Sequence, residues 1–436
     1  MNFPLPVSIS LAAAGMAAAL MLGPLSLTAA EPGPRPRRSA LAPEPDWTQL
    51  EPYQRTITRK EFLSLLHSVY APGEAWRQTI TFTPTAAVIH PPGGRKVNFR
   101  LEFAPGAAAR QPAPRYWRPA GSLPKKPDRP LAGYTIAIDP GHIGGRWAQM
   151  EERWFRIDGS RPVMEGTMVL RVARLLEARL HALGARVVLV RKRTEPVTPL
   201  RPKQLQAEAL AELKRKGITQ IRHGYDGPED PLKFNSLQWQ SELLFYRVSE
   251  IRERARRVNG SIRPDLVVCL HFNAEAWGDP ANPRLTEKNH LHLLVNGNYA
   301  PGELALEDVR FDMLVKLLNR STREELGLAD SVAKSLARAT GLPPYVYTDP
   351  ERARRVTDDP YVWGRNLLAN RLYHCPVIFC EPYVMNSRAV FDRVMLGDYR
   401  GERPVDGQER KSIYREYADA VAEGVALYFS KRQERF

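Results

Sequence analysis

Hydrophobic positions in the central part of the chain switch between strand-like runs and helical spacing. After Glu165 the apolar residues recur every three or four positions, which is typical of a helix with one buried face. The positions of this face are Met168, Val172, Leu175, Leu176, Leu180 and Leu183. Apolar runs at Tyr134–Ile138 and Ala185–Val190 lie on either side and predict strands. Because the helix separates them, the two strands are expected to be parallel.

Two further apolar runs, Asp265–Leu270 and Cys375–Cys380, have the composition of buried strands. A third run, Asn289–Val295, also predicts a strand and carries two alternating histidines, His290 and His292, on one side of the sheet. The sequence therefore predicts an α/β fold, with a mostly parallel twisted sheet flanked by helices on both faces.

Residues that can bind a metal or transfer a proton follow these predicted strands. His142 follows the first strand, His271 follows Leu270, Glu381 follows Cys380, and Glu165 opens the helix. In parallel sheets such positions lie together at the carboxyl edge. Two imidazoles and one carboxylate are a common ligand set for a catalytic zinc, and a second carboxylate can act as general base.

Three motifs occur in order around these residues. They are Ile138–His142 with Glu165 and its following helix, then Leu270–Ala274, and then Pro376–Ile378 with Glu381 and Asn386. From about residue 131 to 430 the chain thereby resembles the zinc-dependent N-acetylmuramoyl-L-alanine amidases of bacterial cell walls.

The resemblance implies that His142, Glu165 and His271 bind one zinc ion and that Glu381 is catalytic. The implied reaction is hydrolysis of the amide bond between N-acetylmuramic acid and L-alanine in peptidoglycan, during cell-wall remodelling or turnover. Asn273, Asn386 and His292 are further candidates for substrate binding. His292 and its neighbour His290 can equally form a solvated or supporting face.

The chain departs from the family pattern at several positions. Ile143 stands where the family usually has glycine, Cys269–Leu270 replaces serine and isoleucine, and Pro382–Tyr383 follows the catalytic glutamate. The segment 144–164 is longer and more aromatic and basic than usual, and it contains Glu151 and Glu152, the competing candidates for the carboxylate ligand. These departures leave all ligand and catalytic atoms in place but bear on substrate preference.

Two alternative functions share part of this pattern. A zinc peptidase that cuts within the peptidoglycan stem peptide would use the same metal chemistry. A non-catalytic wall-binding regulator would keep the fold without turnover.

The first 30 residues have the composition of a secretory signal peptide. They contain no charged side chain, and the apolar stretch Ile9–Leu22 is followed by Thr28–Ala30, which resembles a signal-peptidase site. The absence of a basic residue before the apolar stretch leaves an uncleaved anchor as the alternative. No later segment is long and apolar enough to span a bilayer. We expect export to the periplasm or the outer cell envelope.

The formal charge of +15 then belongs to the exported part of the chain. A basic exported protein favours acidic wall polymers as partners, here peptidoglycan. Nucleic acid is not expected, because the sequence has none of the usual binding signatures.

The remaining regions are separated by proline-rich stretches. Residues 31–45 read as a disordered leader, and 105–130 as a stiff linker. Between them, residues 46–104 predict a small α+β domain that binds wall polymer or a partner, or braces the enzyme. Its helix opens at the capping box Thr58–Glu61, and its strands are expected at Thr79–Ile89 and Val97–Phe103, joined by a turn at Pro91–Gly94.

The catalytic region, 131–430, contains an insertion at 202–248 with a helical run at Lys203–Lys216. Such insertions usually form lids or binding walls. A second accessory stretch, 302–336, predicts two helices and carries Glu303 and Glu307. In amidases devoted to cell division, a helix inserted here blocks the zinc site until a protein activator displaces it. A helical wall of the groove is the other reading.

Three cysteines, Cys269, Cys375 and Cys380, lie in or beside predicted buried strands. We expect them to pack as small hydrophobic side chains. A Cys269–Cys380 bridge would require neighbouring strands.

Overall fold

The computed structural model describes residues 38–90, 98–124, 126–279 and 282–433. The predicted signal peptide and the turn at Pro91–Gly94 lie outside the described residues. Of the predicted leader, only residues 38–45 are described, and there the backbone N–H of Ser39 donates to Asp308 Oδ1 at 2.8 Å. Within the described parts of the chain, no helix combines the length and hydrophobicity needed to cross a bilayer.

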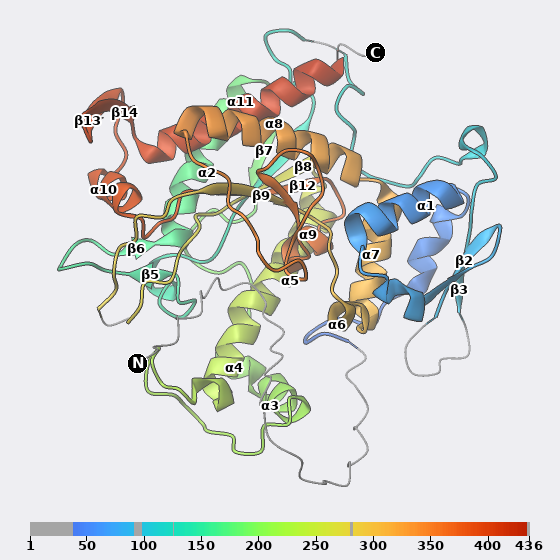
Figure 1. The fold of residues 1–436 in the computed structure, drawn as a ribbon, viewed down its shortest axis with the longest axis horizontal. Coiled ribbons are helices and arrows are strands. Elements are labelled where there is room, and N and C mark those ends of the chain that lie inside the picture. Colours follow the sequence, from blue (N-terminus) through green and yellow to red (C-terminus); the bar gives the residue numbers. More distant parts are fainter. Residues whose placement is uncertain (1–37, 91–97, 125, 280–281, 434–436) are drawn as a thin grey trace.

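A seven-stranded sheet forms the centre of the molecule, in the order β10-β11-β9-β12-β8-β4-β7 (Figure 1). Its strands are β4 (Thr135–Pro140), β7 (Arg186–Leu189), β8 (Leu266–Leu270), β9 (Leu291–Val295), β10 (Arg354–Arg355), β11 (Val362–Gly364) and β12 (Val377–Pro382). The central run β12-β8-β4-β7 is parallel, whereas β9 runs antiparallel to β12 and β10 antiparallel to β11. The predicted strands are confirmed to within about two residues, and so is a mostly parallel sheet.

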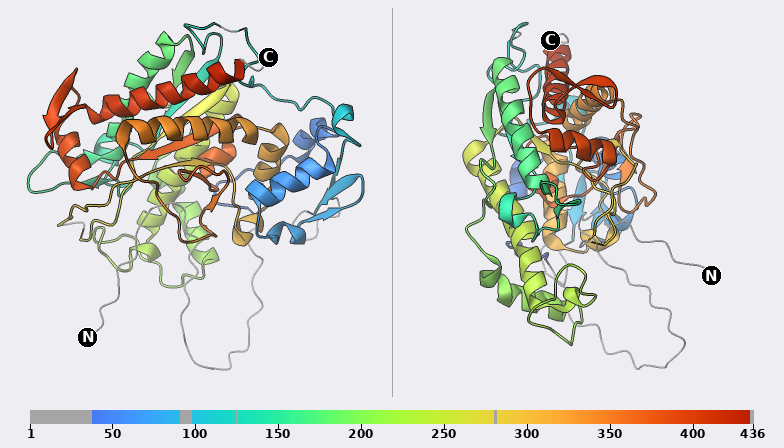
Figure 2. Two further views of the ribbon diagram at one scale, coloured as in Figure 1. Left: turned by 45° about the horizontal axis from the view of Figure 1, so that its top comes forward. Right: turned by 90° about the vertical axis from the view of Figure 1, so that its left-hand side faces the viewer.

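Alternating side chains of the strands divide the core into two layers. On one face, residues such as Ile138, Leu270 and Cys380 pack against helices α2 (Glu165–Ala182), α8 (Thr322–Thr340) and α11 (Ile413–Gln433). On the other face, residues such as Cys269 and Phe379 pack near α5 (Glu250–Arg256) and α9 (Leu368–Leu372). Helices α8 and α11 run side by side in both views of Figure 2. Helices therefore cover both faces, as predicted.

All three cysteines are free and buried. Strands β8 and β12 are neighbours, but Cys269 lies opposite Phe379 in the register, and Cys380 lies opposite Leu270. Successive side chains of a strand point to opposite faces. Cys269 and Cys380 therefore face different layers of the core and do not form the bridge considered from the sequence.

Residues 46–104 form helical turns and a three-stranded antiparallel sheet. Their elements are η1 (Trp47–Tyr53), α1 (Arg59–Leu65), η2 (Leu66–Tyr70), η3 (Ala75–Gln78), β1 (Ile80–Phe82), β2 (Ala86–Ile89) and β3 (Phe99–Glu102). The capping box predicted at Thr58–Glu61 is present. The prediction of one strand at Thr79–Ile89 was wrong, because the chain turns between Phe82 and Ala86 and the two halves pair as β1 and β2.

This N-terminal region completes its core with the accessory stretch 302–336. Buried residues of α6 (Pro301–Leu304) and α7 (Glu307–Asn319) belong to the same hydrophobic cluster as Phe62 and Leu101. Trp47 packs edge-on against Phe311 of α7, with 5.5 Å between ring centroids. The region is thereby braced against the α/β part of the molecule.

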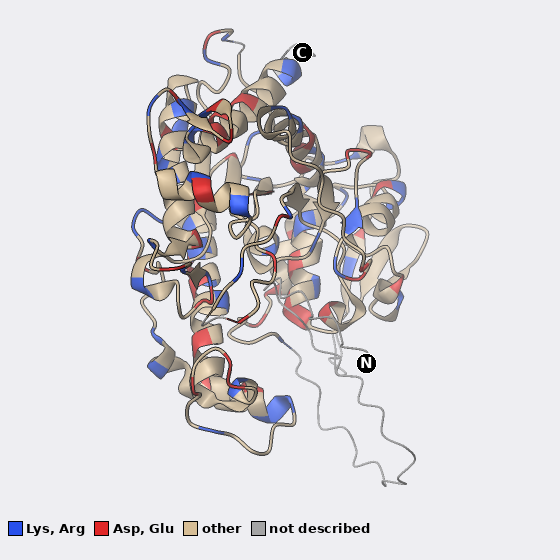
Figure 3. Ribbon diagram, turned by 60° about the vertical axis from the view of Figure 1, so that its left-hand side comes forward, with Lys and Arg blue, Asp and Glu red and all other residues tan. Residues whose placement is uncertain are grey.

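The insertion after β7 contains two helices, α3 (Gln206–Arg215) and α4 (Leu237–Leu243). Both extend beyond the sheet in Figure 2. The predicted helix at Lys203–Lys216 corresponds to a short 3-10 turn followed by α3. The chain returns through η8 (Leu244–Ser249) into α5 and η9 (Arg257–Ile262). Basic and acidic residues are interspersed over these elements in Figure 3.

The remaining elements are short. They are η4 (Ala107–Ala109), η5 (Gly145–Trp147), β5 (Trp154–Phe155), β6 (Val163–Met164), η6 (Pro202–Leu205), η7 (Lys233–Asn235), α10 (Arg388–Leu396), β13 (Glu402–Val405) and β14 (Gln408–Lys411).

Candidate metal centre and active-site cavity

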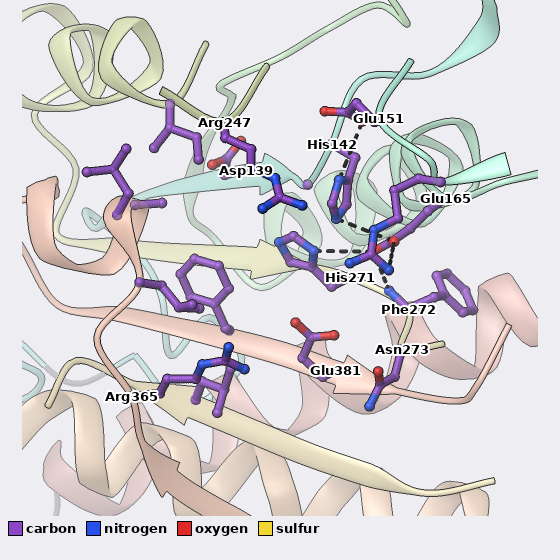
Figure 4. A pocket seen from close by; sticks show the side chains of 18 of the residues that line it. Asp139, His142, Glu151, Glu165, Arg247, His271, Phe272, Asn273, Arg365 and Glu381 are labelled. Carbon is purple, nitrogen blue, oxygen red and sulfur yellow. Dashed lines mark hydrogen bonds and ion pairs between the residues drawn. The ribbon is translucent and has the colours of Figure 1, made fainter. Parts of the chain in front are cut away.

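His142, Glu165 and His271 converge at the carboxyl edge of the parallel strands. One potential ligand atom from each lies within 4.8 Å of the others. His142 follows β4, Glu165 is the first residue of α2, and His271 follows β8. Figure 4 shows both imidazoles turned toward the Glu165 carboxylate. The three residues form a cluster that could hold a metal ion.

The turn after β4 brings the backbone close to the second histidine. The N–H of Gly141 donates to the carbonyl oxygen of Leu270 at 2.9 Å. A Cβ at position 141 would lie 2.2 Å from Cε1 of His271. Glycine is therefore required here for the two histidine-bearing loops to approach each other.

The backbone of His142 is in the left-handed region, with φ of 55°. This conformation is costly for a residue with a side chain and persists where the surroundings hold it. Arg254 supplies such a contact, because its Nη2 donates to the carbonyl oxygen of His142 at 2.7 Å. The histidine is thus held in place from behind the cluster.

The spacing of the cluster suits zinc. His142 Nε2 lies 3.4 Å from Glu165 Oε2, and His271 Nδ1 lies 3.2 Å from Glu165 Oε1. Nitrogen and oxygen ligands at about 2.0–2.1 Å from a tetrahedral zinc are about 3.4 Å apart. Glu165 is 1% exposed, and its Oε2 has no hydrogen-bond partner among the described residues. Its ion-pair distances are 3.4 Å to His142 Nε2 and 3.6 Å to Arg153 Nη1, so this buried oxygen remains available as a metal ligand.

The electrostatics of Glu165 favour its charged form. Burial alone would raise its pKa, but His142, Arg153 and His271 lower the pKa of Glu165 to about 2. The pKa of His271 is raised, since Glu381 and Glu165 outweigh the opposing effect of burial. The cluster therefore presents a carboxylate anion, the form that binds metals.

Glu151 supports His142 rather than competing for the metal. Its Oε2 accepts a hydrogen bond from the N–H of Ile143 at 2.8 Å and lies 3.4 Å from His142 Nδ1. A carboxylate on the far ring nitrogen orients a metal-binding histidine. Glu152 points elsewhere and pairs with Lys233 at 2.7 Å. Of the sequence candidates for the carboxylate ligand, Glu165 is the one in the cluster.

Glu381 enters the same cavity from β12, the strand next to β8 (Figure 4). In the register it lies opposite His292 of β9. Burial raises the pKa of Glu381, His271 lowers it, Glu165 raises it again, and the net direction is upward. A carboxylate with a raised pKa beside a metal cluster is suited to accept a proton.

A cavity of about 210 Å³ opens over these residues. Part of its wall comes from the end of the insertion, through Tyr246 and Arg247. Another part comes from the segment between α8 and α9, through Tyr345, Tyr347 and Arg365. These five residues were missed from the sequence, because no local pattern ties them to the histidine motifs.

The additional substrate-binding candidates have different surroundings. Asn273 and His292 line the cavity. Asn386 does not, and its amide group instead bonds to the backbone N–H and carbonyl of Glu275. His290 lies 3.1 Å from a Glu275 carboxylate oxygen.

Glu303 and Glu307, the candidate blocking carboxylates, are engaged away from the cavity. Glu303 accepts a hydrogen bond from the N–H of Ala300 at the start of α6. Glu307 accepts one from the Trp47 indole at 3.1 Å. Neither glutamate is among the described residues that line the cavity. Their segment packs against the N-terminal region instead.

No family model and no curated protein matches the chain. Solved structures do match. Among them are the N-acetylmuramyl-L-alanine amidase Ami1 from Mycobacterium smegmatis, with 17% identity over 69% of this chain and 99% of that chain at a TM-score of 0.36. The CwlD amidase from Clostridioides difficile, solved in complex with the GerS lipoprotein, is 11% identical in sequence. The match covers 69% of this chain and 100% of that chain, at a TM-score of 0.38.

The amidase AmiC2 of Nostoc punctiforme has 14% identity over 68% of this chain and 98% of that chain, at a TM-score of 0.35. All three are named as amidases, the family that the motifs resemble. Since the identities and TM-scores are low, the function proposed below rests on the site itself.

Proposed function

We propose that this protein is a zinc-dependent N-acetylmuramoyl-L-alanine amidase that acts on peptidoglycan in the cell envelope. The observation that carries this proposal is the convergence of His142, Glu165 and His271 at one point, with Glu381 in the same cavity. Two histidines and a glutamate, with a further glutamate as base, are the parts that metal-assisted amide hydrolysis needs. The order of the motifs along the chain supports the muramoyl amide as the target.

His142, Glu165 and His271 would hold the zinc ion. When bound, zinc would polarise the amide carbonyl and make water more acidic. Glu151 keeps the His142 ring in its orientation, and Arg254 fixes the loop that carries the ring. Each of these contacts reduces the movement of the ligands before substrate arrives.

Glu381 would serve as the general base. Its carboxylate accepts a proton from the attacking water and then returns that proton to the nitrogen of L-alanine as the amide bond breaks. The raised pKa of Glu381 helps both steps, because a more basic carboxylate takes the proton readily and still releases it to an amine. The products are a free lactyl carboxylate on the sugar and a free amino terminus on the peptide.

Export to the periplasm or the outer envelope is part of the proposal, on the strength of the uncharged apolar stretch at residues 9–22. A protein activator is a further proposed partner. The neighbour CwlD was solved together with a lipoprotein, GerS. For the present chain, the insertion helices α3 and α4, which extend beyond the sheet, are the elements that such a partner could contact.

Digestion of purified peptidoglycan, with and without a chelator, tests the proposal. The expected products, identified by mass spectrometry, are stem peptides with intact L-alanine amino termini, and chelation should prevent their release. Fragments cut within the stem peptide would indicate a zinc peptidase instead. Binding to peptidoglycan without release of any product would indicate a non-catalytic regulator.

A further inference from the structure

Arg365 is a buried cation in the wall of the active-site cavity. It follows β11 and is 8% exposed. Its only hydrogen bond from the side chain, among the described residues, runs from Nη1 to the Tyr347 hydroxyl at 3.3 Å. No carboxylate of the described chain forms an ion pair with it. In Figure 4 it lies on the far side of Glu381 from His142 and Glu165.

Some of the other buried arginines pair with carboxylates, whereas Arg191 donates to backbone carbonyl oxygens. Arg254 pairs with Asp139 and Glu250, Arg371 pairs with Asp312, and Arg393 pairs with Glu416. This is expected, because a buried charge is costly unless it is paired. Arg365 has neither kind of partner among the described residues and lines the cavity.

Tyr347 fixes the orientation of Arg365. The tyrosine hydroxyl lies 3.1 Å from His292 Nε2, and burial holds the pKa of His292 well below its usual range. The neutral imidazole can therefore accept a hydrogen bond from the tyrosine hydroxyl, while the hydroxyl oxygen accepts one from Arg365. This chain of contacts leaves the other N–H groups of the guanidinium for the cavity.

A guanidinium with free parallel N–H groups recognises a carboxylate by two hydrogen bonds. In a muramoyl peptide, the lactyl carboxyl group of the sugar is consumed in the amide bond that is cut. The remaining carboxylates therefore belong to the peptide. We infer that Arg365 binds a carboxylate of the stem peptide and selects for acidic peptides, an inference that rests on the proposed amidase function.

Two soluble muramoyl peptides that differ only in whether the peptide carboxylates are free or amidated test this inference. The zinc-loaded wild-type protein should cleave the free acid with a kcat/KM about 10- to 100-fold higher, in line with the strength of a charged hydrogen bond. Arg365→Gln should abolish that preference, mainly by raising KM for the free acid. Arg365→Lys should keep part of it, because the charge remains.

Arg355→Gln is the matched control, since it removes an exposed arginine of β10 outside the cavity. It should keep the full preference. Thermal melting of each variant separates loss of binding from loss of fold. If Arg365→Gln lowers kcat equally on both substrates, or if the wild type shows no preference, the inference is overturned.

Failure of the amidase proposal has a separate signature. If the wild type cleaves neither substrate, titration calorimetry with the acid and amidated forms of the free stem peptide still decides the role of Arg365. Tighter binding of the acid by the wild type, lost in Arg365→Gln, supports the inference. Equal binding of the two peptides overturns it.

Discussion

Two neighbouring clusters of charged residues line the same cavity, and they differ in how completely their polar atoms are hydrogen-bonded. In the closed cluster, Arg254 donates to Glu250, Asp139 and the carbonyl oxygens of Pro140 and His142. The Tyr373 hydroxyl donates to the second oxygen of Asp139, and the N–H groups of Val197 and Thr198 donate to Glu250.

The open cluster is formed by His142, Glu165 and His271. It leaves Glu165 Oε2 without a hydrogen bond from the described residues. This difference indicates that the closed cluster stabilises the fold, whereas the open cluster is arranged for binding. A buried polar network that is fully satisfied holds the fold together, whereas one that is incomplete is arranged for something that binds. Substitutions beside the open cluster should therefore act mainly on turnover and metal binding, and substitutions in the closed cluster mainly on the free energy of unfolding.

Glu381, beside the open cluster, should give the largest effect. Glu381→Gln removes the base but keeps the shape of the side chain, so turnover of peptidoglycan should fall about 100- to 10,000-fold. Zinc content, measured by atomic emission, and thermal stability should stay as in the wild type. Glu402→Gln, on the exposed strand β13, is the control. Full activity of Glu381→Gln would remove this residue from the mechanism.

Arg254 should show the opposite behaviour. Arg254→Met leaves Asp139 and Glu250 buried without their partner, and the free energy of unfolding should fall by about 3–5 kcal/mol. Urea denaturation measures this change. Arg256→Met, at the end of the same helix, removes an exposed guanidinium that pairs with Glu253 and should lower the free energy of unfolding much less. Equal effects of the two variants would mean that the closed cluster does not stabilise the fold.

Zinc itself should stabilise the open cluster. At a free zinc concentration about 100 times the Kd, the metal should add about 2.7 kcal/mol to the free energy of unfolding of the wild type. In Glu165→Gln, which lacks the anionic ligand, most of this gain should be absent. Glu177→Gln, further along the same helix, should keep it. Differential scanning calorimetry with and without zinc makes the comparison, and an equal gain in all three proteins would argue against this site.

Glu151 should have the smallest of these effects. Glu151→Gln weakens the hold on the His142 ring, so zinc affinity should fall about 10- to 100-fold, while activity at saturating zinc stays close to that of the wild type. Competition with a chromophoric chelator measures the affinity. Glu152→Gln is the neighbouring control, since Glu152 pairs with Lys233 outside the cluster. A loss of zinc affinity in Glu152→Gln as large as in Glu151→Gln would contradict the assigned role.

The sequence by itself determined the strands β4, β8 and β12, the helix α2 and the residues that follow or open them. Apolar runs and helical spacing indicate which residues of a short stretch are buried. A histidine or glutamate directly next to such a stretch therefore lies at the end of a strand or at the start of a helix. For this reason the amino-acid pattern alone places His142, Glu165 and His271 at one edge of the sheet, where the structure brings them together.

Only the tertiary structure decided which groups surround that cluster. The pairing of Glu151 with His142, the cavity wall around Arg365, and the common core of residues 46–104 with α7 all join segments that local patterns do not connect. Periodicity shows that a residue is buried. It does not show which residues it contacts, because these contacts depend on how the helices and strands pack together. The split of Thr79–Ile89 into two strands shows the same limit at short range, since its apolar pattern continues through a reversal of the chain.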